Sequence, residues 1–294
     1  NMGAAILRAI GDSKRPLYYL IICSFVNIVL DLVLIIVFRL GVLGAAVATL
    51  VAQAVSAVLV TLTLMYKTDG MKLYLSQIRF YGKMLLDILK IGLPAGAEAV
   101  MYSISNIIVQ VSINNFGVDT MAAWTAYSKI DFIFWMINSA FGISIMTFVG
   151  QNFGAGKWER IKKGTKICLG MALVSAISLS VILISTERFL FGIFVNDTGV
   201  IEIGMVMMNV IAPAYFLFVF IEIFSGALRA QGAVLVSTMI TMIGICILRV
   251  IWVTMIAGGG TLKQVILCYP VTWAVGAFAM SVYYLYKQKK ANMY

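Results

Sequence analysis

Long apolar runs alternate with short polar or basic stretches along most of this 294-residue chain. Each run is long enough to cross roughly 30 Å of hydrocarbon as an α-helix. The pattern therefore predicts an all-α, polytopic helical bundle with about eight transmembrane helices. The apolar runs cover residues 17–38, 42–66, 89–115, 121–149, 164–186, 200–228, 233–257 and 262–286.

Composition narrows the class of protein further. Hydrophobic residues make up 62% of the chain, charged residues only 12%, and the mean hydropathy is +1.00. A soluble domain cannot bury that much apolar surface, so we expect the lipid bilayer to be the chain's main partner.

The most polar stretch, 67–88, divides the chain. It carries four basic residues and several aromatic ones, which favours an amphipathic helix lying on the membrane surface. We therefore expect three parts: residues 1–66 with the end of one helix and two transmembrane helices, a cytoplasmic linker at 67–88, and six helices at 89–294.

Basic residues predict the orientation of the helices. Seventeen Lys and Arg residues fall on one side of the predicted bundle and only Arg39, Arg188 and Lys263 on the other. The side rich in Lys and Arg is normally cytoplasmic, so we expect the C-terminus in the cytoplasm. The basic residues lie between apolar runs and form no patch with interleaved aromatics, which argues against nucleic-acid binding.

A short motif occurs twice. Leu7-Arg8-Ala9-Ile10-Gly11 is echoed by Leu228-Arg229-Ala230-Gln231-Gly232, and two apolar runs follow each copy. Duplicated units of membrane helices are common in secondary transporters.

Several kinds of chemistry are missing from the sequence. The chain has no His, its four Cys lie in apolar runs without metal-ligand spacing, and Gly156-Lys157 is not followed by the Ser or Thr of a nucleotide-binding loop. We therefore expect no enzyme, no cofactor and no catalytic residue, and an ion gradient as the energy source.

Acidic residues inside the apolar runs are the candidate functional groups. A charge at the centre of a membrane helix costs ~2.5–3.5 kcal/mol, so Asp31, Glu98, Asp131 and Glu222 need a partner, water or a proton. Three of the four share a helical face with polar or aromatic residues. These faces are Glu98-Tyr102-Ser105-Ser112, Tyr127-Asp131-Trp135-Asn138-Gly142 and Tyr215-Phe218-Glu222-Arg229.

Such carboxylates could exchange cations or simply hold helices together. Desolvation favours the uncharged form of a buried carboxyl group, which suits it to trade a proton or Na⁺ for a cationic substrate. In the static alternative, Glu222 pairs with Arg229 or Arg249, and Asp131 pairs with Lys129 or Arg249. For Asp31 we favour a structural hydrogen bond alongside Asn27.

Prolines are expected to interrupt three helices, at Pro94, Pro213 and Pro270. Glu98 follows Pro94 by four residues, where a broken helix would leave carbonyl groups free to bind a cation. We therefore favour a functional role for Glu98.

Four sequence features resemble the multidrug and toxic compound extrusion (MATE) transporters. They are Gly92-Leu93-Pro94-Ala95-Gly96-Ala97-Glu98, the loop Gly150-Gln151-Asn152-Phe153-Gly154-Ala155-Gly156, the two Leu-Arg-Ala-x-Gly motifs, and Asn27-Ile28-Val29-Leu30-Asp31. The resemblance implies twelve helices in two six-helix lobes. This chain would then hold the end of the fourth helix, the fifth and sixth helices, the linker and the complete second lobe, and would not transport alone.

The resemblance also implies a function: Na⁺- or H⁺-coupled export of cationic, amphipathic compounds by alternating access. The full-length protein is then expected to act as a monomer in a bacterial plasma (inner) membrane. Two carboxylate positions of one branch of the family are occupied here by Tyr102 and Phe218. The rival readings are a lipid-linked oligosaccharide flippase of the same superfamily and a non-transporting membrane scaffold.

These considerations give a set of candidate residues. For cation coupling we expect Glu98 first, then Glu222 and Asp131, with Na⁺ at Glu98 or Glu222 as the only metal. The expected cavity residues are Tyr102, Asn106, Trp135, Asn138, Tyr215 and Phe218. The expected structural residues are Asp31, Gly150, Gln151, Gly154, Arg229 and Arg249.

Overall fold

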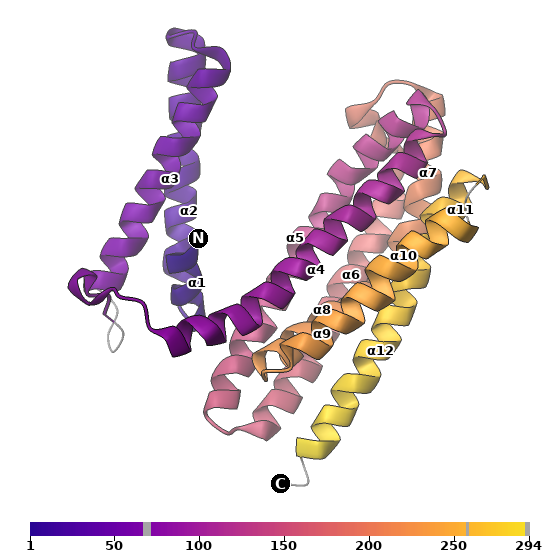
Figure 1. Cartoon of the computed structure of the whole chain (residues 1–294). Coiled ribbons are helices and arrows are strands. Elements are labelled where there is room, and N and C mark those ends of the chain that lie inside the picture. The colour runs from indigo at the N-terminus through magenta and orange to yellow at the C-terminus, as the bar shows by residue number, and fades with distance from the viewer. Residues whose placement is uncertain (67–71, 257–258, 292–294) are drawn as a thin grey trace. The chain divides into compact units, whose positions relative to one another are not determined.

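The computed structural model describes residues 1–66, 72–256 and 259–291 of the chain. Its described residues are almost entirely helical and include no strand (Figure 1), which confirms the all-α prediction. The chain divides into two compact units, Asn1–Gly82 and Lys83–Tyr294.

The first unit is a helical hairpin preceded by a short helix. Its elements are α1 (Met2–Ala9), α2 (Lys14–Asp31), the π-helical turn η1 (Leu32–Val37), α3 (Gly41–Tyr66) and the 3-10 turn η2 (Leu75–Gln77). The small, buried side chains of Ala48 and Ala52 on α3 let α2 approach closely, and the Cys23 thiol donates to the Ala52 carbonyl at 3.0 Å. The Tyr19 and Thr63 hydroxyls form a second link between α2 and α3.

The second unit consists of six rods, three of them broken into shorter helices. The rods are α4 (Gly82–Asn114); α5 (Val118–Gly154); α6 (Trp158–Phe194); α7 (Thr198–Ile211), η3 (Ala212–Ala214) and α8 (Tyr215–Ala230); α9 (Val234–Thr241), η4 (Met242–Ile247), α10 (Leu248–Ile251) and η5 (Trp252–Ile256); and α11 (Leu262–Ile266) with α12 (Cys268–Ala291).

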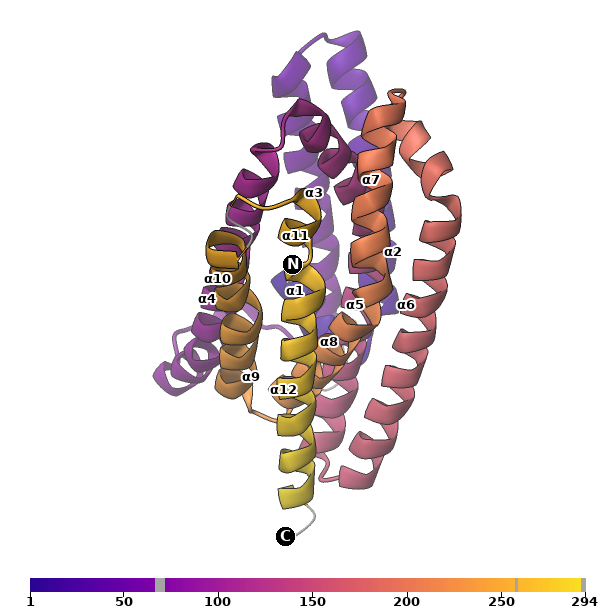
Figure 2. The ribbon, with the colours of Figure 1, turned by 90° about the vertical axis from the view of Figure 1, so that its right-hand side faces the viewer.

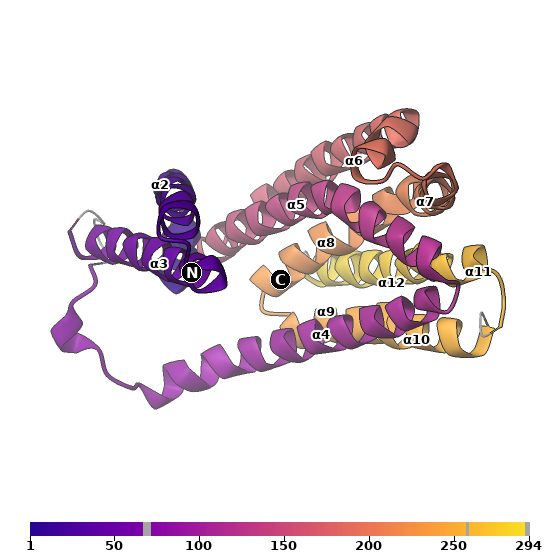
Figure 3. The ribbon, with the colours of Figure 1, turned by 90° about the horizontal axis from the view of Figure 1, so that it is seen from above.

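The core of this unit is centred on α8. In Figure 3, which shows the molecule from above, α8 and α12 lie between α5 on one side and α9 and α10 on the other. Figure 2 shows α12 running alongside α9. Glycines permit the closest approaches: a Cβ on Gly244 would lie 3.6 Å from the Gly276 Cα, and one on Gly226 would lie 3.1 Å from the Gly142 carbonyl oxygen.

Seven helices of the described part are long and apolar enough to cross a membrane, against the eight that the sequence predicts. The predicted run at 89–115 is helical, as α4, but it is not among the seven. Polar side chains such as Glu98, Asn106 and Gln110 lower its hydropathy.

The prolines act differently from one another. Pro94 does not interrupt α4, which runs unbroken past it, so the prediction of a break there is wrong. Pro213 lies in η3, where the rod does break, and the Ser180 hydroxyl donates to the Ala212 carbonyl of that turn at 2.8 Å. Pro270 lies in the first turn of α12, just after the break at Leu267.

The predicted amphipathic linker helix at 67–88 is also wrong where the structure describes it. Residues 67–71 lie outside the described residues. Between 72 and 81 the only helical segment is η2, and Gly82–Ile88 forms the beginning of α4.

The duplicated motif folds the same way in both copies. A helix ends just before Gly11 and before Gly232, which have φ of 91° and 80°. The amide of the residue after each glycine donates to the carbonyl of the motif leucine, at 3.0 and 2.9 Å. Leu7 and Leu228 are both completely buried. The motif is therefore a helix-ending device that anchors its leucine in the core of its own unit.

Candidate functional site

Asp131 is the centre of a hydrogen-bonded cluster on α5 and α8. The Trp135 indole Nε1 donates to Oδ2 at 2.6 Å, and the Tyr215 hydroxyl donates to Oδ1. The Tyr127 and Tyr215 hydroxyl oxygens lie 3.3 Å apart. Because the Tyr215 proton is given to Asp131, Tyr127 must be the donor in that second bond. The three groups form a relay from Tyr127 through Tyr215 to the carboxylate.

The cluster opens into a pocket of about 400 Å³. Aromatic rings dominate its lining, and Asp131 supplies the only carboxylate among the residues that form it. The Phe134 ring stacks on Tyr215 with centroids 3.9 Å apart and fixes the tyrosine from behind. The pocket is lined by Tyr102, Asn106, Gln110, Trp124, Tyr127, Ser128, Asp131, Phe132, Trp135, Ile211, Tyr269 and Trp273.

Arg249 lies against the wall of this pocket and is completely buried. Its Nη1 donates to the Asn106 side-chain oxygen at 3.0 Å. Its guanidinium carbon lies 4.3 Å from the Tyr269 ring centroid and 5.4 Å from that of Tyr102. Within the described part of the chain, no carboxylate is in ion-pair contact with it. The aromatic wall of the pocket thus already holds one cation through ring faces.

Glu98 on α4 pairs with Arg229 at the end of α8. The Arg229 Nη2 lies 2.6 and 2.7 Å from the two carboxylate oxygens, and the Glu98 side chain is only 13% exposed. Sequence reasoning expected Arg229 to pair with Glu222 if it paired at all. The structure instead gives Glu98 the permanent basic partner.

Glu222 lies in the same region without a cation of its own. No ion pair or hydrogen bond is found for its carboxylate among the residues described, and Oε1 occupies the space that a side chain on Gly142 would fill. Gly142 on α5 therefore makes room for the carboxylate of α8. Glu98, Glu222 and Arg229 all line a second pocket of about 300 Å³.

The two pockets adjoin each other. Tyr102 lines both, and the Phe218 ring of the second pocket contacts the Trp135 ring of the first, with centroids 4.7 Å apart. A charge bound in one pocket therefore lies close to the groups of the other.

Most of the predicted site residues come together here, and some do not. Of the predicted cavity residues, four line the two pockets: Tyr102, Asn106, Trp135 and Phe218. Tyr215 is not among the lining residues, but its hydroxyl donates to Asp131, which lines the first pocket. Asn138 lines neither pocket: it is buried against α6, next to Ala172 and Ala176. The expectation that Asn138 lines the cavity is wrong. The face of α5 that carries Asp131 and Trp135 points into the pocket, but at Asn138 it faces α6.

The remaining predicted residues lie elsewhere. Gly150, Gln151 and Gly154 form the last turns of α5, before a turn that needs the positive φ of Gly156. Asp31 ends α2 in the first unit. The expected structural hydrogen bond alongside Asn27 is not seen, because Asp31 Oδ1 and Asn27 Nδ2 are buried without a hydrogen-bond partner among the described residues. None of the ion pairs proposed for Asp131 or Glu222 occurs among the described residues.

Sequence reasoning missed the wall contributed by α12. Tyr269 and Trp273 are four residues apart and follow the break at Leu267, but their helix is apolar on all sides, so its pattern does not show which face lines a cavity. A search of the described residues finds no group of three or more metal-ligating His, Cys, Asp or Glu side chains.

Comparison with known proteins identifies the family to which the chain belongs. The sequence profile of the MatE family matches residues 94–255, more than half of the chain. The probable multidrug resistance protein YoeA of Bacillus subtilis is 26% identical over 298 residues, covering 98% of this chain and 64% of that protein. The FAD transporter of Shewanella oneidensis is 25% identical over 273 residues, covering 90% of this chain and 60% of that protein.

Solved structures agree on the fold. A MATE protein in its bent conformation superposes with a TM-score of 0.90 at 20% identity, covering 99% of this chain and 65% of that one. The chain spans less than two thirds of the length of each of these three proteins. The family match and the seven apolar helices agree with the resemblance found in the sequence. The chain belongs to the MatE family of multi-pass membrane transporters, the multidrug and toxic compound extrusion proteins.

Proposed function

We propose that the full-length protein is a secondary antiporter that exports cationic, amphipathic compounds in exchange for Na⁺ or H⁺ by alternating access. It would act as a monomer in a bacterial plasma membrane, with the C-terminus in the cytoplasm. The observation that carries the proposal is the pocket around Asp131. An aromatic-lined cavity with one carboxylate that no cation neutralises is the chemistry that recognises an organic cation.

The charges around the two pockets suggest how exchange would work. With every group ionised, Glu98, Asp131 and Glu222 contribute three negative charges, while Arg229 and Arg249 contribute two positive ones. One negative charge is left over. A single monovalent cation neutralises it, so a bound Na⁺ or proton and a bound organic cation exclude one another, which is the requirement for antiport.

The three carboxylates would have different roles. Asp131, held by two neutral donors among aromatic rings, would face the substrate. Glu222, which forms no ion pair with any residue that the structure describes, would take the coupling ion. Glu98 would hold Arg229 in place, so we now rank it behind Glu222 for direct coupling, in contrast to the sequence-based order.

An efflux assay tests the proposal. The full-length gene product is expressed in bacteria lacking their own multidrug pumps, and ethidium efflux is followed while the Na⁺ and pH gradients are varied independently. We expect one of the two gradients to drive efflux, and Asp131→Asn and Glu222→Gln to slow it by at least about tenfold, a loss of roughly 1.4 kcal/mol of transition-state stabilisation.

The control is Glu159→Gln, which removes an acid whose side chain is 91% exposed and should leave efflux unchanged. A membrane scaffold without transport activity would tolerate all of these changes. The proposal would be refuted if ethidium efflux were independent of both the Na⁺ and the pH gradient. It would also be refuted if the double variant Asp131→Asn/Glu222→Gln transported ethidium as fast as the parent.

Arg249 favours a second candidate function. A fully buried guanidinium without a carboxylate partner among the described residues could bind an anionic group, as in a flippase for lipid-linked oligosaccharides. One relative is named an FAD transporter. For this function Arg249→Gln would abolish transport of a phosphate-bearing substrate while Asp131→Asn would leave it intact, which is the opposite of the result expected for organic cations.

A further inference from the structure

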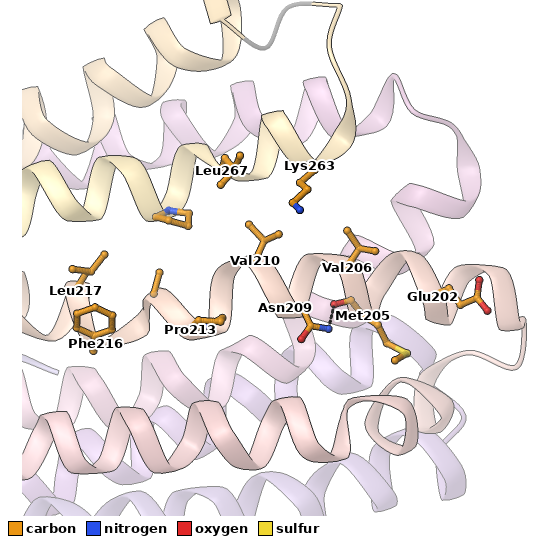
Figure 4. Close-up of a pocket in the computed structure, with 12 residues that line it drawn as sticks. Glu202, Met205, Val206, Asn209, Val210, Pro213, Phe216, Leu217, Lys263 and Leu267 are labelled. Carbon is orange, nitrogen blue, oxygen red and sulfur yellow. Dashed lines mark hydrogen bonds between the residues drawn. The ribbon is translucent and has the colours of Figure 1, made fainter.

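A third cavity, away from the acidic pockets, is formed by the rods α7–α8 and α11–α12. Figure 4 shows its residues, and its volume is about 690 Å³. Both rods break beside it, at η3 with Pro213 and at Leu267. Its lining residues are Glu202, Met205, Val206, Asn209, Val210, Pro213, Ala214, Phe216, Leu217, Lys263, Leu267 and Pro270.

The cavity is a groove on the outside of the bundle. Val206 and Phe216 are 45% and 39% exposed, although both lie in a segment apolar enough to span a membrane. From Glu202 to Leu217 the rod extends about 22 Å at 1.5 Å per residue, more than the ~15 Å half-thickness of the hydrocarbon core. The groove is therefore long enough to hold an acyl chain along one leaflet.

One end of the groove is charged. Glu202 lies near the start of α7, and Lys263 lies in the first turn of α11, so both belong to helix ends on the same side of the bundle. Figure 4 shows Lys263 extending from α11 toward α7, with Glu202 farther along α7. Both side chains are exposed, and neither makes an ion pair with any residue that the structure describes.

The other acid of this region is already satisfied. The Asn209 amide donates to both carboxylate oxygens of Glu187, at 3.0 and 2.9 Å, and to the Met205 carbonyl at 2.9 Å. Glu202 and Lys263 are therefore the two ionisable groups that the groove presents to a ligand. An apolar trough with one acid and one base at its polar end is complementary to an amphiphile with two acyl chains and a zwitterionic headgroup.

We propose that this groove is a binding site for a phospholipid with a phosphoethanolamine headgroup. The Lys263 ammonium donates to the lipid phosphate, the primary ammonium of the headgroup donates to Glu202, and an acyl chain lies along Val206, Val210 and Leu217. A purely anionic headgroup would be repelled by Glu202. A choline headgroup has no N–H to donate to that carboxylate.

Native mass spectrometry of the purified protein tests this assignment. Phosphatidylethanolamine, phosphatidylcholine and phosphatidylglycerol with identical acyl chains are titrated in turn, and free glycerophosphoethanolamine serves as the headgroup without chains. We expect phosphatidylethanolamine to bind most tightly and the free headgroup to show no saturable binding. Lys263→Gln should weaken the binding of phosphatidylethanolamine by about fivefold in Kd, as expected when one basic residue near a lipid phosphate is lost.

Two further variants make the test decisive. Glu202→Gln should shift the preference from phosphatidylethanolamine toward phosphatidylglycerol, because it removes the repulsion of a net anionic headgroup. Lys289→Gln changes an exposed lysine at the far end of α12 and should alter nothing. Equal binding of the three lipids, or the same affinity for Lys263→Gln as for Lys289→Gln, would overturn the proposal.

Discussion

At the residue scale, the site depends on which polar atoms are satisfied by neutral groups and which by charged ones. Asp131 accepts from Trp135 and Tyr215, which stabilise its charge without cancelling it, whereas Glu98 is cancelled by Arg229. This difference determines which carboxylate can bind a further cation. Only a carboxylate whose charge is still uncompensated gains appreciably from binding an additional cation.

Gly142 offers a residue-scale prediction. In Gly142→Ala, the new methyl group would overlap the Glu222 carboxylate and force it out of its place between α5 and α8. We expect cation-driven ethidium efflux by the full-length protein to fall at least about tenfold, a change of roughly 1.4 kcal/mol.

The matched control for this prediction is Gly150→Ala on the same helix, where a Cβ meets no heavy atom within 4 Å. Replacing glycine by alanine in a helix stabilises it by up to ~1 kcal/mol, so this control should fold at least as well as the parent. If the two variants transport equally, Gly142 does not set the position of Glu222.

At the scale of elements, α4 is the helix most loosely joined to its unit. Only Ser105, Val109 and Ile113 on it are buried, and polar side chains make its links to α8 and α10. These links are Glu98 to Arg229 and Asn106 to Arg249. Because α4 carries one wall of both pockets, its attachment bears directly on how the pockets open.

Glu98→Gln should therefore loosen α4 selectively. The change leaves Arg229 without its partner, and because both side chains are partly exposed we expect a loss of about 1–2 kcal/mol in unfolding free energy, less than for a fully buried pair. Hydrogen exchange should speed up in α4 and change little in α5, α6 and α12.

The double variant Glu98→Gln/Arg229→Gln provides the comparison, since it removes both charges and should be less destabilised than Glu98→Gln alone. Uniformly faster exchange across all six rods, or additive losses in the double variant, would show that the pair does not specifically hold α4.

The same scale shows what the sequence could predict. Apolar runs are local features of the sequence, and they predicted the positions of the helices well. Contacts between helices were harder. Glu98 and Arg229 are 131 residues apart, and their pairing depends on how two helices are rotated about their axes. The pattern of α4 showed its polar face, but not which partner that face meets.

The predicted helix break at Pro94 was wrong because a proline alone does not determine whether a helix is interrupted. A proline removes one donor from its helix, but the backbone of α4 continues through the position without a break. Pro213, in contrast, coincides with a break at which the Ser180 hydroxyl of α6 donates to the Ala212 carbonyl. This contact comes from another helix and cannot be read from the local sequence.

At the scale of the whole molecule, the central claim is that the two acidic pockets together carry one negative charge that a coupling ion and an organic cation share. Neutralising any one of the three carboxylates should then remove organic-cation binding. Arg249→Gln should instead remove one positive charge, which raises the net negative charge to two and strengthens organic-cation binding.

Equilibrium binding of tetraphenylphosphonium to the purified full-length protein tests this claim most directly. Isothermal titration calorimetry is carried out over a range of Na⁺ concentrations at fixed pH, and over a range of pH at fixed Na⁺. The account predicts that the apparent Kd rises in proportion to one of the two ions, with one site per protein, and that Asp131→Asn abolishes binding. A Kd that is independent of both ions, or unchanged in Asp131→Asn, would contradict it.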